Sequence, residues 1–153
     1  MSASAILIPL ALSIISGALS ASDARKRLAA APQNNGVAQI ETRFNDASLL
    51  VKTLNEHGIQ TFVESENRII TQFAEGRITY IRASEGAPFI MEVSEVGDIQ
   101  CLLDELETIE TEYQGNVQSY TYERVINNLP DGMTIESEQV LDDNSIVITL
   151  NVE

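Results

Sequence analysis

The sequence predicts an α+β protein in which an N-terminal apolar helix is followed by a mostly antiparallel sheet that helices cover on one face. Three observations predict this class. The side chains carry no charge before Asp23. Short segments of alternating polarity cluster between residues 37 and 96, and apolar residues recur at helical spacing after Asp98. Clustered strands favour an antiparallel sheet, because a parallel sheet needs strands and helices that alternate along the chain.

The 153 residues divide into an apolar helix over 1–31, a linker over 32–36 and an acidic α+β domain over 37–153. Pro32 and Gly36 mark the linker, since both residue types end helices.

The domain is predicted to begin with a strand over 37–44 and a helix over 45–58, which Asn45 or Asp46 caps and Gly58 ends. Three or four strands follow, over 59–65, 68–74, 77–83 and 88–96. An amphipathic helix then begins at Asp98, and its apolar face consists of Leu102, Leu103, Leu106, Ile109 and Tyr113. A second helix over 116–128 and a hairpin of 133–140 with 145–152 close the chain.

The apolar N-terminal stretch supports three interpretations. As a helix, residues 1–22 extend about 33 Å, which just spans a hydrocarbon core of about 30 Å, so residues 5–21 could anchor the chain in a membrane. Ala18 to Ser20, followed by Ala21, resemble a small-residue cleavage site, and a cleaved signal over 1–20 would export the protein. Alternatively, the helix is buried between copies of the chain: Ser13, Gly17 and Ala21 recur every four residues and would let two helices approach closely.

A basic flank, Arg25, Lys26 and Arg27, follows this stretch, and no basic residue precedes it. This order is the reverse of a secretory signal and, by the positive-inside rule, places the domain in the cytoplasm. The flank is expected to fix orientation against anionic headgroups or the acids of a neighbouring subunit.

The charge and cysteine content exclude some classes of function. The net charge is −14, and all but one of the acidic residues follow residue 36, so the domain repels phosphate backbones and direct nucleic-acid binding is not expected. Cys101 is the single cysteine, which rules out an intramolecular disulfide.

The sequence predicts no catalytic, cofactor-binding or metal-binding residues, and we therefore expect no enzymatic activity. His57 is the one histidine, and we interpret it as the end of a helix. We expect Cys101 to be a buried or half-buried thiol whose pKa Asp98 and Asp104 raise. The acidic run from Asp104 to Glu112 is interpreted as a solvated helix face, and 142–145 as a turn.

Two stretches carry a family resemblance: IETRFNDASLLVKTLNEHG (40–58) and YQGNVQSYTYERVINNLPDGMTIESEQVLDDNSIVITL (113–150). Their order of elements resembles the family of the conserved plastid reading frame ycf thirty-five, a domain of unknown function, over most of 37–153. Asn144 stands where that family usually has a glycine. The resemblance implies a small, non-enzymatic cytoplasmic module that acts as an adaptor for an AAA ATPase or a small β-grasp partner.

The hypothesis from the sequence is a non-enzymatic structural or interaction module. Its N-terminal apolar helix would drive membrane anchoring or self-assembly into a homo-oligomer and would display the acidic domain to a protein partner. The alternative is the cytoplasmic adaptor, with the helix serving for localisation alone.

Overall fold

The computed structural model describes residues 2–8 and 21–152 of the chain. The chain forms two compact units: unit 1 comprises Met1–Ala11 with Gln114–Glu153, and unit 2 comprises Leu12–Tyr113. The long helix α4 (Ile99–Asn127) contributes its first half to unit 2 and its second half to unit 1. Within the described ranges, none of the helices combines the length and apolar character that a membrane span requires.

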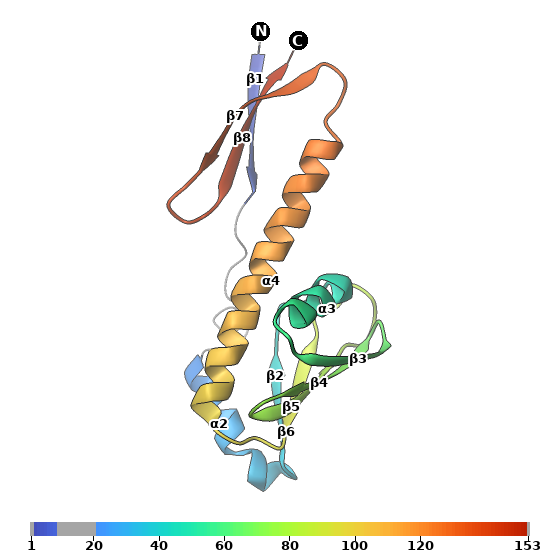
Figure 1. Cartoon of the computed structure of the whole chain (residues 1–153), viewed down its shortest axis with the longest axis vertical. Helices are drawn as coiled ribbons and strands as arrows, with labels where there is room; N and C mark the ends of the chain where they lie inside the picture. Colours follow the sequence, from blue (N-terminus) through green and yellow to red (C-terminus); the bar gives the residue numbers. More distant parts are fainter. Residues whose placement is uncertain (1, 9–20, 153) are drawn as a thin grey trace. The chain divides into compact units, whose positions relative to one another are not determined.

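Unit 2 is built on a five-stranded antiparallel sheet in the order β2-β6-β5-β4-β3, which can be followed in Figure 1. The strands are β2 (Val37–Glu41), β3 (Gln60–Ser65), β4 (Arg68–Phe73), β5 (Gly76–Ile81) and β6 (Ile90–Ser94). Helix α3 (Ala47–Glu56) lies between β2 and β3 in the sequence, and the Asp46 carboxylate accepts a hydrogen bond from Leu49 N at its N-terminus. These strands and this helix confirm the elements predicted over residues 37–96.

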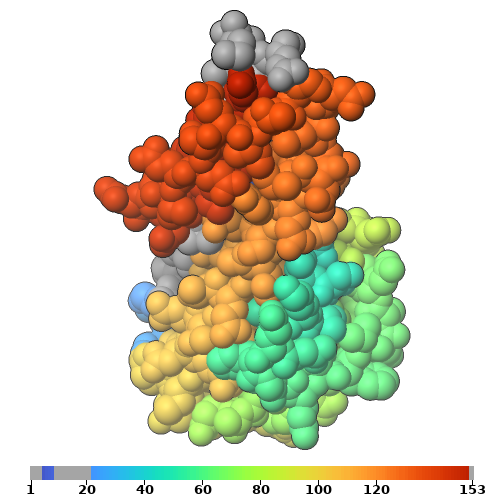
Figure 2. Space-filling view, turned by 45° about the horizontal axis from the view of Figure 1, so that its top comes forward, coloured from blue at the N-terminus to red at the C-terminus, as the bar shows by residue number. Residues whose placement is uncertain are grey.

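One face of this sheet is buried and the other is open. Along β2, β4, β5 and β6 buried side chains alternate with more exposed ones, as a half-covered sheet requires. Leu50 and Leu54 of α3 are fully buried, and so are Leu102 and Ile109 on the predicted apolar face of α4. In two views α3 lies beside the first half of α4 (Figures 1 and 2).

An aromatic cluster connects the elements of this core. The ring of Phe44 lies 4.6 Å from that of Tyr113 on α4 and 5.9 Å from that of Tyr80 on β5. The Tyr80 ring also contacts Phe89 edge-on, at 6.5 Å. Edge-to-face pairs of this kind add about 0.5–1.5 kcal/mol each beyond the burial of their area.

Unit 1 is a separate three-stranded antiparallel sheet in the order β1-β8-β7. It consists of β1 (Ser2–Ile8), β7 (Met133–Val140) and β8 (Ile146–Val152). The centre of its core is formed by Ile8, Ile148 and Leu150, and Tyr122 and Val125 from α4 pack against it. The predicted closing hairpin is confirmed by the pairing of β7 with β8.

The predicted fold, an N-terminal apolar helix followed by one helix-covered sheet, is wrong. Residues 2–8 form a strand that pairs with β8, whose residues lie at the other end of the sequence. Strands β1, β8 and β7 form a second sheet, so the closing hairpin does not join the five-stranded one. Sequence periodicity missed the strand because its Ala, Ile and Leu residues suit a helix equally well and its partner is remote. Residues 9–20, which hold most of the predicted anchor over 5–21, lie outside the described residues.

The helical part of the chain also differs from the prediction. Instead of two helices, α4 runs without a break from Ile99 to Asn127 and includes Gly115. It is neither N-terminal nor apolar, and it is the longest helix that the structure describes. Within the predicted 1–31 helix, the part described as helix is α2 (Ala21–Ala29), which is followed by a short 3-10 helix, η1 (Ala31–Asn34).

Candidate functional site

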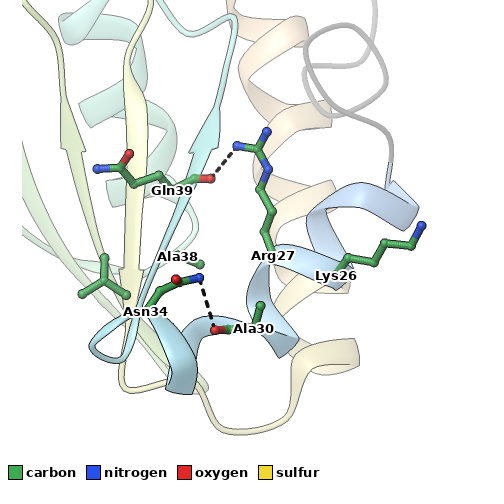
Figure 3. Close-up of a pocket in the computed structure, with 7 residues that line it drawn as sticks. Lys26, Arg27, Ala30, Asn34, Ala38 and Gln39 are labelled. Carbon is green, nitrogen blue, oxygen red and sulfur yellow. Dashed lines mark hydrogen bonds between the residues drawn. The ribbon is translucent and has the colours of Figure 1, made fainter.

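A groove in unit 2 lies between α2 and the edge strand β2 (Figure 3). Its volume is about 530 Å3. The side of α2 and η1 contributes Lys26, Arg27, Ala30 and Asn34, and the side of β2 contributes Val37, Ala38 and Gln39. Two of the three residues of the predicted basic flank therefore line this groove.

The sequence positions α2 through its small and apolar residues. Ala24, Leu28 and Ala31 are buried and follow one another at helical spacing, so one face of α2 packs on unit 2 while Arg25 and Lys26 stay exposed. Asp23 in the first turn and the basic residues in the last turn both complement the helix dipole.

A tight reversal then brings the chain from η1 into β2. Asn35 has φ 59° and Gly36 has φ 75°, both in the left-handed region, and Gly36 N donates to Ala31 O at 2.8 Å. Glycine and asparagine adopt this conformation at the least cost. Because of this turn, β2 runs alongside the helix that precedes it.

Arg27 spans the groove and binds the free edge of β2. Its Nη1 donates to the backbone oxygen of Gln39 at 2.9 Å (Figure 3). The same nitrogen lies 3.4 Å from Glu41 Oε1. On the other side of β2, Thr42 N donates to Phe89 O, and backbone groups alternate in direction along an antiparallel strand. Gln39 and Glu41 therefore turn their backbone groups away from β6, and Gln39 is also one of the residues that line the groove.

The other two basic residues of the flank lie differently. Lys26 is exposed and its side chain extends away from β2 (Figure 3). Arg25 lies near enough to Asp98 to help hold the pKa of that carboxyl below its ordinary value, after the larger effect of the hydrogen bonds that Asp98 accepts from Cys101. In a chain of net charge −14, α2 groups three cations, of which Arg25 and Arg27 have acidic neighbours.

The groove offers a specific set of polar groups. Arg27 is a planar fork of donors suited to a carboxylate, and Lys26 supplies a mobile positive charge at the rim. Asn34 Nδ2 binds its own turn, at 3.4 Å from Ala30 O. The outward backbone groups of Gln39 and Glu41 can pair with an extended chain. The arrangement therefore suits a ligand that is both extended and negatively charged.

The predicted helix–helix interface is not brought together in the described part of the chain. Ser13 and Gly17 lie outside the described residues, and Ala21 is the first residue of α2. The predicted membrane anchoring and cleaved signal fall largely on the same undescribed stretch and stay predictions.

His57, Cys101 and Glu110 carry ionisable groups in unit 2. His57 caps α3, and its Nδ1 lies 3.3 Å from Glu112 Oε1 on α4, a contact that the sequence did not indicate.

Cys101 is exposed, so the expected burial of its thiol is wrong. The residue lies to one side of the apolar helix face to which the buried Leu102 belongs. Asp98 raises the pKa of its thiol, as predicted, with a smaller contribution from Asp104. Glu110 is buried beside Ile109, so the acidic face is not wholly solvated.

Two buried polar side chains, Arg82 and Tyr80, differ in how their polar groups are satisfied. Arg82 stacks over the Phe89 ring at 4.5 Å and donates to Asn67 Oδ1 and Asn45 O. The Tyr80 hydroxyl is fully buried and, in the part of the chain that the structure describes, has no hydrogen-bond partner. Burial raises its pKa well above the ordinary range. Among the described residues no group of His, Cys, Asp and Glu side chains has the arrangement of a metal site.

Comparisons of the chain with models of known protein families, with curated proteins and with solved structures find no match. The resemblance to the family of the plastid reading frame ycf thirty-five stays a prediction. We therefore infer the function from the groove.

Proposed function

We propose that the chain is a non-enzymatic interaction module that binds an extended, acidic segment of a partner protein in the groove between α2 and β2. The observation that carries the proposal is the contact between Arg27 and the outward-facing carbonyl of Gln39. An edge strand normally needs protection against stray pairing, and here one side chain supplies it.

Binding would proceed by an exchange of hydrogen bonds. A carboxylate of the incoming segment accepts hydrogen bonds from the guanidinium of Arg27, which then releases the Gln39 carbonyl. A backbone N–H of the same segment donates to that carbonyl instead. Arg27 can bind a carboxylate through two parallel N–H···O bonds, whereas it binds the Gln39 carbonyl through one. The exchange therefore favours an acidic segment over a neutral one.

The remaining parts of the groove support this assignment. Added strands gain affinity from the main chain and specificity from side chains beside the edge, and Lys26 and Arg27 are the charged residues of the lining. The net charge of −14 repels acidic partners elsewhere on the surface. An adaptor for an AAA ATPase or a small β-grasp protein, as the family resemblance implies, would use the same groove, because an adaptor also works by holding a protein segment.

The test is a fluorescence-anisotropy titration with two labelled peptides, one of alternating glutamate and valine and one of alternating lysine and valine. We expect saturable binding of the glutamate peptide alone. Arg27→Gln should weaken that binding about tenfold, since it removes one charge-assisted, partly exposed contact. Arg77→Gln is the matched control, because Arg77 is exposed on β5 and lies outside the groove.

Equal binding of both peptides, or equal losses in Arg27→Gln and Arg77→Gln, would show that attraction to charge in general, and not the groove, accounts for the binding. Absence of saturable binding of the glutamate peptide would contradict the proposed function.

A further inference from the structure

The two edges of the unit 1 sheet differ in charge. Strand β7 forms one edge and carries Glu136 and Glu138. Strand β1 forms the other edge, and its sequence, SASAILI, contains neither a charged residue nor a proline. Natural proteins protect edge strands with charges, prolines or bulges. By this criterion β7 is protected, both by its charges and by a register shift between Ile135 and Ser137. Strand β1 has neither kind of protection.

The register identifies which backbone groups of β1 point away from the sheet. Leu141 N donates to Ser145 O across the hairpin, so odd-numbered residues of β8 turn toward β7 and even-numbered ones turn toward β1. Ile146 and Ile148 pair with Ile8 and Ile6 of β1. Ala5 and Leu7, which lie between these paired positions, therefore direct their N–H and C=O groups outward, on the side where no described residue adds a strand.

The side chains at this edge are apolar and accessible. Leu7 is 58% exposed, and Ala5 is exposed beside it on the same face. An uncharged edge with accessible apolar side chains has the properties of a strand-pairing surface.

We propose that β1 is a self-association edge, at which β1 of one copy pairs antiparallel with β1 of a second copy. The charge distribution favours a second copy as the occupant. Two chains of net charge −14 repel each other, so they can approach most easily where neither carries a charge, and β1 satisfies this condition on both sides. A β7 edge offers Glu136 and Glu138 instead, and like charges oppose its pairing with itself.

Antiparallel pairing of one edge with itself is twofold and closed. It therefore ends at a dimer with a continuous six-strand sheet, rather than extending into a filament. The residues involved belong to unit 1 and none of them lines the groove of unit 2, so this inference is independent of the proposed function.

The test is sedimentation equilibrium of the full chain over a concentration series, with two matched variants. Ala5 and Ser137 lie on either side of Thr149 in the register, on the same face of the sheet, one at each edge. Ala5→Lys should reduce the mass about twofold, from twice 16.8 kDa to 16.8 kDa, because it places a charge at the pairing edge. Ser137→Lys adds the same charge at the other edge and should leave the dimer intact.

Ala5→Pro provides a second variant, since it removes an outward N–H while leaving the β1–β8 bonds in place. Both Ala5 variants should keep the far-ultraviolet circular dichroism of the wild type, and loss of the dimer with that spectrum retained supports the proposal. A wild type that is monomeric throughout the series would overturn it. So would dissociation of Ser137→Lys or a mass that grows without limit, since each of these indicates β1 pairing with β7.

Discussion

Arg27 Nη1 donates to the backbone oxygen of Gln39 at 2.9 Å, across the groove that separates α2 from the edge of β2. The same nitrogen lies 3.4 Å from Glu41 Oε1, whose side chain is 55% exposed. One guanidinium therefore holds both a backbone acceptor and an internal carboxylate. This carboxylate is in the place where the carboxylate of an acidic ligand would bind.

Glu41 should for this reason compete with the ligand. Glu41→Gln removes the internal carboxylate and should strengthen binding of the glutamate–valine peptide by about twofold, since an exposed ion pair contributes at most about 1 kcal/mol. Fluorescence anisotropy measures the change. Glu64→Gln is the control, because Glu64 forms a comparable exposed ion pair with Arg68, away from the groove. Weaker binding after Glu41→Gln would contradict a competing role for Glu41.

Gly36 and Gly115 should respond in opposite ways to the same substitution. A Cβ at either position meets nothing within 4 Å, so the backbone conformation decides the result. Gly36 has φ +75°, and Gly36→Ala should cost about 1 kcal/mol of unfolding free energy. Gly115 lies inside α4, where Gly115→Ala should stabilise by up to about 1 kcal/mol. Urea unfolding of both variants measures the two signs, and a destabilising Gly115→Ala would argue against a continuous α4.

Tyr80 and Tyr113 form a second matched pair. The Tyr80 hydroxyl is buried without a described hydrogen-bond partner, so Tyr80→Phe should raise the unfolding free energy by about 1 kcal/mol. The Tyr113 hydroxyl instead accepts hydrogen bonds from Asn45 N and Asp46 N, so Tyr113→Phe should lower the unfolding free energy by about 1 kcal/mol. Thermal and urea unfolding would test both. A destabilising Tyr80→Phe would show that this hydroxyl is satisfied in solution.

Asp98 should make the stability of the chain depend on pH in the acid range. The hydrogen bond from Cys101 N lowers the pKa of the Asp98 carboxyl in the folded state. The stability that Asp98 contributes is therefore complete above its unfolded-state pKa of about 4 and is lost as the pH falls through its folded-state pKa. The melting temperature of Asp98→Asn should therefore lie below that of the wild type at neutral pH and converge with it as the solution is acidified. Asp143, whose pKa is lowered by Ser145 N, should give the same convergence in Asp143→Asn. A difference that stays constant down to about pH 2 would contradict this linkage.

Local sequence signals predicted much of unit 2. Alternating polarity predicted the strands β2 to β6, and Asp46 predicted the start of α3. The apolar spacing from Leu102 to Tyr113 predicted the buried side of α4. These signals are complete within short windows of sequence. The continuity of α4 was missed because Gly115 resembles a break, although a glycine inside a helix costs only about 1 kcal/mol.

The pairing of β1 could not be predicted from such windows. Ile6 pairs with Ile148, and no residue near Ile6 in the sequence indicates that it pairs with so distant a strand. The basic flank was recognised in the sequence, but the groove that Lys26 and Arg27 line was not predicted. The contact of Arg27 with Gln39 depends on the left-handed turn at Asn35 and Gly36, which returns β2 alongside α2.

The most direct test of binding beside β2 is a nuclear magnetic resonance titration of the isotope-labelled chain with the glutamate–valine peptide. We expect saturable shifts in the backbone amides of Gln39 and Glu41 and in the Arg27 side chain, with little change along β3 at the opposite edge of the same sheet. Shifts confined to β3, or no saturable shifts in β2 and Arg27, would contradict the proposed site.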